Sequence, residues 1–320
     1  MPVTVEIPVE KFRGAVREVR LGAGADDGGT RTRVVTVGGE TALPFLQFEG
    51  KMPHRPALAV EICEQAPHGW SPLLTEAWGS VISDPAAWAA KAADLGADLV
   101  LVQVQDGGAQ PVSAADLASR CRAVLQACGL PLLVVGPGAA ERDNELLVAV
   151  ADATSGERVM LGRCAEGNYR TIVAAAMANG HGVIAATPID VNLAKQLNIL
   201  IRDMNLPLDR VLMDPTTGAL GYGLEYTYSV MERLRLAALQ GDEMTQQPMV
   251  CFAGPEAWRQ KEARTGEGAP AEWGDWRRRA VLWETLTATT LVHSGADVLV
   301  LRHPDTLVLV QHNIAELMGQ

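Results

Sequence analysis

Eight short apolar runs recur along the chain, and each is followed by a segment whose apolar residues return with the period of a helix. The runs cover residues 57–63, 99–104, 130–136, 159–164, 182–188, 211–215, 249–254 and 298–303. Apolar strands that alternate with amphipathic helices are typical of consecutive βα units around a parallel sheet. Eight such units predict an α/β fold, a closed (β/α)8 barrel of the TIM type.

Capping residues mark the ends of several predicted helices. Asp84 precedes Pro85 and His303 precedes Pro304, so each pair is an N-cap followed by a proline in the first turn. Ser113 is a further predicted N-cap. The predicted helix-ending glycines are Gly129, Gly180 and Gly241.

Residues 211–242 are the most informative stretch of the chain. Asp214 and Pro215 end an apolar run, and Gly218, Gly221 and Gly223 form a bend ahead of a long amphipathic helix. The apolar stripe of that helix, predicted to face the barrel wall, consists of Leu224, Tyr228, Met231, Leu234 and Ala238. Strand ends and the loops that follow them carry the sites of barrel proteins, so this segment is predicted to form one wall of a site.

Residues 1–55 precede the first run and form a predicted N-terminal extension, which leaves 56–320 for the barrel. Short β-like runs at 33–37 and 43–48 flank Gly38 and Gly39. Such an extension either plugs the bottom of the barrel or contacts a partner, and the pattern does not choose between them.

Two predicted loops are unusually long. One covers residues 64–83 and contains Trp70 and Trp78, and the other covers 254–274 and contains Trp258 and Trp273. They follow the first and the seventh strand, and in a closed barrel strands 7, 8 and 1 are neighbours. The two loops are therefore predicted to rise together on one side of the barrel mouth.

Several kinds of chemistry are not indicated by the sequence. A Schiff-base aldolase of this fold needs a lysine on a strand, and none of Lys11, Lys51, Lys91, Lys195 and Lys261 falls in an apolar run. The 5 cysteines are scattered and form no C-x-x-C pair, so no iron–sulfur or zinc site is predicted. Among the histidines only His303 ends a predicted strand, where a structural role is the commoner one.

Polar residues at the predicted strand ends offer amides, hydroxyls and carboxylates, without an evident nucleophile and base. They are Gln103, Gln105, Asp106, Arg163, Asn168, Thr187, Asp190, Asn192, Asp214, Thr216, Thr217, Arg302 and His303, with a glycine–proline turn at 136–138. Such a rim suits the covering of a reactive cofactor better than attack on a substrate. The alternative is that these residues only solvate the rim.

The glycine bend does not predict a nucleotide site. Its order, with Gly218, Gly221 and Gly223, reverses the G-x-G-x-x-G fingerprint, and it follows a sixth strand instead of a first one. The glycines serve either helix packing or a close approach to a ligand.

The composition is that of an ordinary globular protein, with 320 residues, 48% hydrophobic and 20% charged. A formal charge of -11, from 27 basic and 38 acidic residues, argues against nucleic acid or an anionic membrane as partner. No signal-peptide pattern or membrane-length apolar run is present, which predicts a cytoplasmic protein.

A family resemblance rests on many short matches in order. The longest are 214–226 (DPTTGALGYGLEY) and 231–242 (MERLRLAALQGD). Others are 28–31 (GGTR), 37–39 (VGG), 42–45 (ALPF), 48–50 (FEG), 55–56 (RP), 168–169 (NY), 195–200 (KQLNIL), 204–209 (MNLPLD), 256–258 (EAW), 261–262 (KE) and 302–304 (RHP). With these residues the chain resembles the small (delta) subunit of the corrinoid iron–sulfur protein in the acetyl-CoA synthase/CO dehydrogenase system. The serine of the family after Asp-Pro is Thr216 here, which keeps a hydroxyl.

The resemblance implies a non-catalytic TIM-barrel subunit of a heterodimer. A large subunit would carry a [4Fe-4S] cluster and a corrinoid domain, and the corrinoid would lie between that domain and the top of this barrel. The cobalt would take a methyl group from methyltetrahydrofolate through a separate methyltransferase and deliver it to acetyl-CoA synthase in the Wood–Ljungdahl pathway. The chain lacks an Asp-x-His-x-x-Gly corrinoid motif and a cluster-binding cysteine set, so both belong to the large subunit.

Two functions remain open at this point: a carrier subunit, and a pterin-dependent methyltransferase that binds methyltetrahydrofolate at the same face through Asp and Asn. No catalytic residue and no metal ligand is assigned to this chain. The corrinoid contacts are expected at Asp214, Thr216, Thr217, Gly218, Gly221, Tyr222 and Gly223, and then at Thr187, Asn168 and Gly136.

Overall fold

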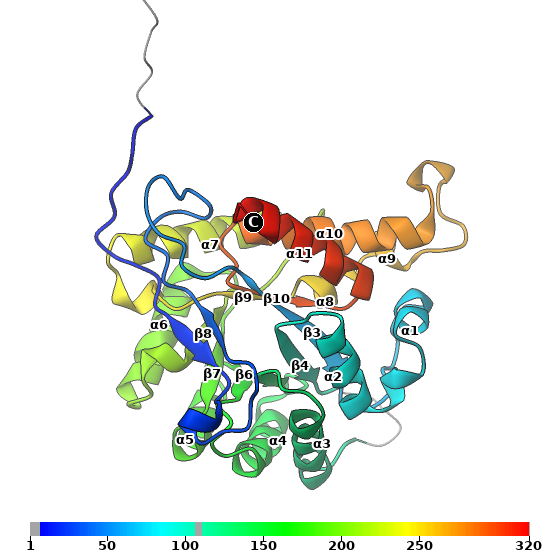
Figure 1. Cartoon of the computed structure of the whole chain (residues 1–320), viewed down its shortest axis with the longest axis horizontal. Coiled ribbons are helices and arrows are strands. Elements are labelled where there is room, and N and C mark those ends of the chain that lie inside the picture. The colour runs from blue at the N-terminus through cyan, green and yellow to red at the C-terminus, as the bar shows by residue number, and fades with distance from the viewer. Residues whose placement is uncertain (1–6, 106–110, 320) are drawn as a thin grey trace, which may run out of the picture.

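The computed structural model describes residues 7–105 and 111–319, and its centre is an eight-stranded parallel sheet (Figure 1). The strands are β3 (Ala57–Cys63), β4 (Leu99–Gln103), β5 (Leu132–Val135), β6 (Met160–Cys164), β7 (Gly182–Ala186), β8 (Val211–Asp214), β9 (Val250–Cys251) and β10 (Val298–Leu301). Their order is β8-β7-β6-β5-β4-β3-β10-β9. A parallel bridge between Met213 and Met249 joins the two edges, so the sheet closes into the predicted barrel.

Helices cover the outside of the strands (Figure 1). They are α1 (Pro72–Trp78), α2 (Pro85–Asp94), α3 (Ala114–Ala127), α4 (Ala140–Ala153), α5 (Tyr169–Asn179), α6 (Val191–Asp203), α7 (Leu224–Leu239), α8 (Ala253–Ala257), α9 (Lys261–Arg264), α10 (Trp276–His293) and α11 (Pro304–Leu317). None of the described helices is long and apolar enough to cross a membrane.

The strands separate two apolar cores. Alternate residues point inward, where Ala57, Leu99, Leu133 and Val298 belong to the core of the barrel. The intervening residues point outward and pack beneath the helices in a larger core that includes Leu58 and Trp88. This burial on both faces explains why the strands read as continuous apolar runs.

Local capping follows the sequence closely. Asp84 and His303 cap α2 and α11 ahead of their prolines, and Ser113 caps α3. Gly180, with φ of 76°, ends α5 in the left-handed conformation that suits glycine.

The predicted stripe of α7 was wrong at one position. Leu224, Met231, Leu234 and Ala238 are buried, but Tyr228 is 41% exposed. Arg235 and Leu239 share this side of the helix and are buried two to three turns later. The exposure of Tyr228 therefore comes from its place near the start of α7, where its ring turns to solvent.

The N-terminal extension contributes a two-stranded antiparallel sheet of β1 (Val19–Leu21) and β2 (Val35–Val37). Val19, Leu21 and Val37 are buried in the same core as the inward residues of the barrel. The hairpin therefore plugs the bottom of the barrel, one of the two roles that the sequence left open.

The β-like run predicted at 43–48 was wrong, because these residues form turns. Pro44 lacks the N–H that a strand needs, and Phe45 has a positive φ of 61°. The ring of Phe45 packs edge-on against His293, with centroids 5.8 Å apart. Apolar residues in this run thus anchor a turn on α10.

Buried polar contacts fix the extension to the barrel. Arg31, 5% exposed, donates to the carbonyls of Leu125, Cys128 and Leu130 at 2.5, 2.7 and 3.2 Å, which satisfies carbonyls at the end of α3.

A buried ion triad adds a second tie. Arg235 of α7 lies 3.2 Å from Glu40 and 2.8 Å from Asp297. Burial raises the pKa of Asp297, and the nearby guanidinium of Arg235 acts in the opposite direction.

The two long loops come together as predicted. Trp70, Leu73 and Leu74 of the first loop share a small apolar cluster with Trp258 and Ala263 of the second, joined by residues of α10. Figure 1 shows α1 and α9 on the same side of the molecule. The loops therefore form one raised wall beside the mouth.

Candidate functional site

The last inward-facing layer of the barrel is polar and charged. Glu61 follows the inward Ala57 and Ala59 on β3, and Asp214 ends β8. Beyond β9 and β10 the same alternation brings Phe252 and Arg302 to this layer. The apolar core thus ends in a floor of charged side chains at the mouth.

Asp214 forms the first ion pair of this floor. Its Oδ2 lies 3.0 Å from Nε of Arg163, which belongs to β6, across the intervening strand β7. The guanidinium of Arg163 also lies 4.3 Å above the ring of Phe252. Burial raises the pKa of Asp214, while Arg163 and the N–H of Thr216 act in the opposite direction.

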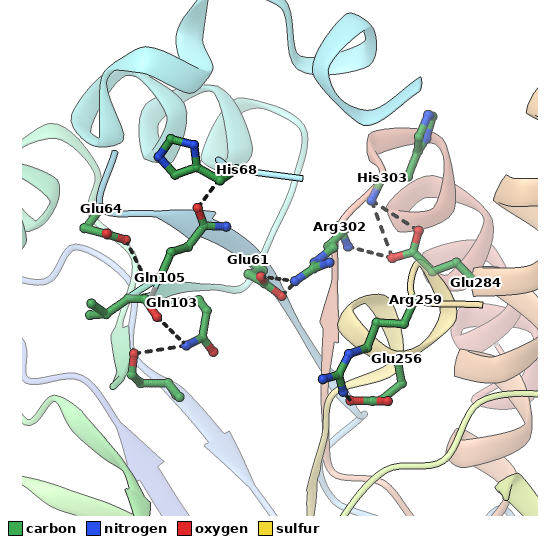
Figure 2. Close-up of polar contacts among 12 residues, drawn as sticks. Glu61, Glu64, His68, Gln103, Gln105, Glu256, Arg259, Glu284, Arg302 and His303 are labelled. Atoms are coloured by element: carbon green, nitrogen blue, oxygen red, sulfur yellow. Dashed lines mark hydrogen bonds and ion pairs between the residues drawn. The ribbon is translucent and has the colours of Figure 1, made fainter. Parts of the chain in front are cut away.

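Arg302 and Glu61 form the second pair, a bidentate one drawn in Figure 2. Arg302 donates from Nη2 and Nε to the two carboxylate oxygens at 2.6 and 3.1 Å. Its guanidinium lies 4.7 Å from the ring centroid of Trp70, and Trp78 donates to its carbonyl at 2.7 Å. Arg302, which directly follows β10, therefore supports the first long loop.

Two glutamines at and just beyond the end of β4 complete the floor. Gln103 donates to the carbonyls of Val104 and Gly136 at 2.9 and 3.0 Å (Figure 2). Gln105 donates from its backbone to Glu64 at 3.1 Å and accepts from the N–H of His68 at 2.8 Å. Asp106, another residue predicted at this rim, lies outside the described residues.

The segment after β8 is held by its hydroxyls. Thr216 adopts a left-handed φ of 67°, and its Oγ1 donates to the carbonyl of Thr187 at 2.6 Å. The hydroxyl of Thr217 accepts from the N–H of Phe252 at 2.8 Å. These contacts connect the loops after β7, β8 and β9, so the segment is a rigid part of the rim.

The glycines of this bend have different roles. A Cβ on Gly218 would lie 2.5 Å from the backbone of Gly223, so Gly218 lets the bend fold on itself. Gly221 and Gly223 have φ of 74° and 87°, which favours glycine. Tyr222 is 40% exposed and donates to Glu262 of α9 at 2.9 Å, which ties the bend to the second long loop.

The other predicted contacts divide between the rim and its support. The hydroxyl of Thr187 is buried and has no hydrogen-bond partner among the described residues. The side chain of Asn168 accepts from Ala165 N and donates to Arg163 O, so it shapes the turn that carries Arg163. Gly136 provides room, because a Cβ there would lie 2.2 Å from Asp143.

The side chains of two further predicted rim residues accept from backbone N–H groups at helix starts. Asp190 caps α6 by accepting from Asn192 N and Leu193 N at 2.7 and 2.9 Å. His303 accepts from Asp305 N at 3.0 Å, and its ring stacks on Trp258 with centroids 5.9 Å apart. Burial lowers the pKa of His303 to about 4. Both residues therefore hold the helix starts around the mouth.

Within 7–105 and 111–319, no three His, Cys, Asp or Glu side chains gather as a metal site would require. The cysteines are buried and unpaired. Burial raises the thiol pKa of Cys121 and Cys164 to about 12, which makes these groups poor nucleophiles.

Residues 18–319 match the family described as CO dehydrogenase/acetyl-CoA synthase delta subunit. The chain belongs to this family. The resemblance seen in the sequence is thereby confirmed. Relatives include subunit delta of the acetyl-CoA decarbonylase/synthase complex from Methanopyrus kandleri, 40% identical over 91% of this chain and 72% of the relative. The subunit of the same name from Archaeoglobus fulgidus is 35% identical over 97% of this chain and 70% of the relative.

Solved structures with the same architecture are dihydropteroate synthases. The enzyme from Xanthomonas albilineans superposes with a TM-score of 0.56 and 15% identity, over 86% of this chain and 97% of that enzyme. The enzyme from Coxiella burnetii gives a TM-score of 0.56 and 12% identity over 87% and 99%. At this identity the likeness establishes the barrel fold alone.

Sequence reasoning missed parts of the site in this member of the delta subunit family. Glu61 is a carboxylate in the interior of an otherwise apolar run, a signal that could have drawn attention to it. Phe252 and Glu284 carried no such signal. Glu284 lies within α10, yet it accepts from the N–H of Arg302 at 2.6 Å (Figure 2).

Proposed function

We propose that this chain is the small subunit of a heterodimeric corrinoid iron–sulfur methyl carrier. The partner would be a large subunit that holds a [4Fe-4S] cluster and a corrinoid domain. In this role the barrel mouth covers the corrinoid, while a methyltetrahydrofolate:corrinoid methyltransferase and acetyl-CoA synthase act before and after it. Membership of the delta subunit family supports this assignment, as do the names of the relatives, which are subunits of an acetyl-CoA decarbonylase/synthase complex.

The observation that carries the proposal is the neutralised floor of the mouth. The carboxylates of Asp214 and Glu61 are paired with Arg163 and Arg302. A general base needs a carboxylate free to accept a substrate proton, and these two are already engaged. A floor of paired charges suits a subunit that positions and shields a cofactor.

The residues at the rim fit a large, amide-bearing ligand. Thr187 has a buried hydroxyl without a partner among the described residues, and Arg163 has a side chain that is 43% exposed. Gly221 and Gly223 bring backbone to the rim without side chains. When bound, the corrinoid would supply a cobalt that accepts and releases a methyl group. This chain would hold the edge of the ring and exclude water from it.

The alternative, a pterin-dependent methyltransferase, would use free Asp and Asn side chains at the same face. The side chain of Asn168 is engaged by the backbone of its own turn, and Asp214 is engaged by Arg163. Both would have to exchange partners before binding a pterin. The geometry therefore favours the carrier.

Coexpression with the large subunit, followed by gel filtration, tests the assignment. A stable heterodimer is expected, and two subunits that elute separately would contradict it. Calorimetric titration of this chain alone with methyltetrahydrofolate tests the alternative. Heat that fits a dissociation constant below about 10 μM would favour the methyltransferase.

A further inference from the structure

The guanidinium of Arg163 is fixed on two sides. Its Nε lies 3.0 Å from Oδ2 of Asp214, and its central carbon lies 4.3 Å from the ring centroid of Phe252. Oδ1 of Asp214 is itself fixed, because it accepts from the N–H of Thr216 at 2.9 Å. An arginine held by an ion pair and by an aromatic face loses little freedom when it binds a further group.

The terminal nitrogens of Arg163 remain available for such a group. No hydrogen bond from these nitrogens to another described residue is found, and the side chain is 43% exposed against 4% for Asp214. The paired carboxylate offsets the positive charge, so an anion gains little attraction at this place. A neutral carbonyl oxygen suits it better, because it binds through the hydrogen bond itself and needs no net positive charge.

A second polar group lies at the rim. The hydroxyl of Thr187 is buried and unpartnered within the described residues. It belongs to the same hydrogen-bonded unit, because Thr216 donates to the carbonyl of Thr187. The rim therefore offers a donor at Arg163 and a separate hydroxyl at Thr187 to the polar groups of a large ligand.

We propose that Arg163 binds the oxygen of a carboxamide side chain at the edge of the corrinoid, and that Asp214 is the positioning residue that makes this contact selective for amides over carboxylates. The inference rests on the proposed function, since it names how that mouth recognises its cofactor. A corrin ring carries carboxamide side chains around its edge, which gives Arg163 a ligand of the required chemistry.

Titration of the full chain with two corrinoids tests the inference. Cobinamide carries amides around the ring, and cobyrinic acid carries carboxylates on the same ring. Quenching of tryptophan fluorescence reports the binding of each.

The variants are Arg163→Gln, Asp214→Asn and the control Glu166→Gln. The Asp214→Asn change keeps a side-chain oxygen for the N–H of Thr216. Glu166 is an exposed carboxylate on the loop that follows Arg163, so its replacement removes one charge and no contact within the described residues.

The wild type is expected to bind cobinamide at least about tenfold more tightly than cobyrinic acid. R163Q should bind cobinamide about tenfold more weakly, and D214N should reduce the preference about tenfold because it exposes the guanidinium charge. E166Q should keep the wild-type preference. Thermal unfolding of each variant checks that the barrel remains folded.

A wild-type chain that binds no cobinamide at about 1 mM would overturn the inference. So would R163Q with unchanged affinity, or D214N with the same preference as E166Q. A further outcome is that corrinoid still copurifies with the heterodimer when the variants show unchanged cobinamide affinity and an unchanged preference over cobyrinic acid. That result would refute the role of Arg163 and leave the carrier function intact. A heterodimer purified without corrinoid would count against the carrier function itself.

Discussion

Glu284 of α10 holds the backbone of Arg302, with Oε1 accepting from the arginine N–H at 2.6 Å. Its Oε2 accepts from Trp258 Nε1 at 2.7 Å and from Thr306 Oγ1 at 3.0 Å. This fully buried carboxylate therefore joins the end of β10, the second long loop and the start of α11. The arginine that pairs with Glu61 owes its position to a residue outside the mouth.

Replacing Glu284 with alanine is expected to destabilise the fold by about 2–4 kcal/mol, because several buried donors lose their acceptor at once. Urea unfolding measures the change. The exposed Glu316 of α11 provides the control, and E316Q should alter the free energy of unfolding by less than about 0.5 kcal/mol. Equal effects of the two variants would show that Glu284 is not the organising contact.

Arg31 is predicted to be essential for the attachment of the N-terminal extension. R31A removes the donor to the last carbonyls of α3 and should cost about 2–4 kcal/mol. Arg20, which is 45% exposed and pairs with Asp27, is the matched control, and R20A should cost less than about 1 kcal/mol. A proteolysis assay should show faster cleavage within residues 7–55 in R31A alone, and an equally resistant extension in both variants would contradict the role.

The buried His303 should make stability depend on pH. Its folded pKa is about 4, below the ordinary value of 6.5, so the unfolded chain binds more protons between these values. Stability should therefore fall as the pH decreases from about 6.5 towards 4, by a limit on the order of 3 kcal/mol. H303N retains an N-cap acceptor without a titrating ring. Urea unfolding at pH 7 and 4.5 should show a smaller acid loss in H303N than in the wild type; an identical loss would exclude His303 as the cause.

Thr187 and Thr217 offer a test of which rim hydroxyl serves a ligand. T187V removes a hydroxyl with no partner in the described part of the chain, so stability should be retained while the corrinoid content of the heterodimer falls. T217V removes the acceptor of the Phe252 N–H and should lower stability by about 1–3 kcal/mol. Unchanged corrinoid content in T187V would remove Thr187 from the site.

Much of the fold could be predicted because its signals are local. The strands are mostly apolar on both faces, and residues such as Asp84 and Gly180 mark helix ends within a few positions of their partners. The plug of the barrel could not be predicted in this way. Val19 pairs with Val37 across an irregular segment, and no local pattern specifies that pairing.

The site shows the same division between local and distant information. The sequence identified Arg163 and Asp214 as strand-end residues, because their positions follow from the apolar runs. That they pair across β7 follows from the order of neighbouring strands in the sheet and from the inward direction of both side chains. The contact of Glu284 with Arg302 likewise depends on how α10 packs beside β10, which the sequence does not state.

The visible absorption spectrum of the copurified complex tests the carrier assignment most directly. This chain should be coexpressed with its large subunit, purified under anoxic conditions and compared with the large subunit purified alone. We predict corrinoid bands in the complex at about one corrinoid per heterodimer, with a lower content in the large subunit alone because its cofactor lacks the cover of this barrel. A complex without corrinoid absorption, or a large subunit that retains its full corrinoid without this chain, would contradict the account.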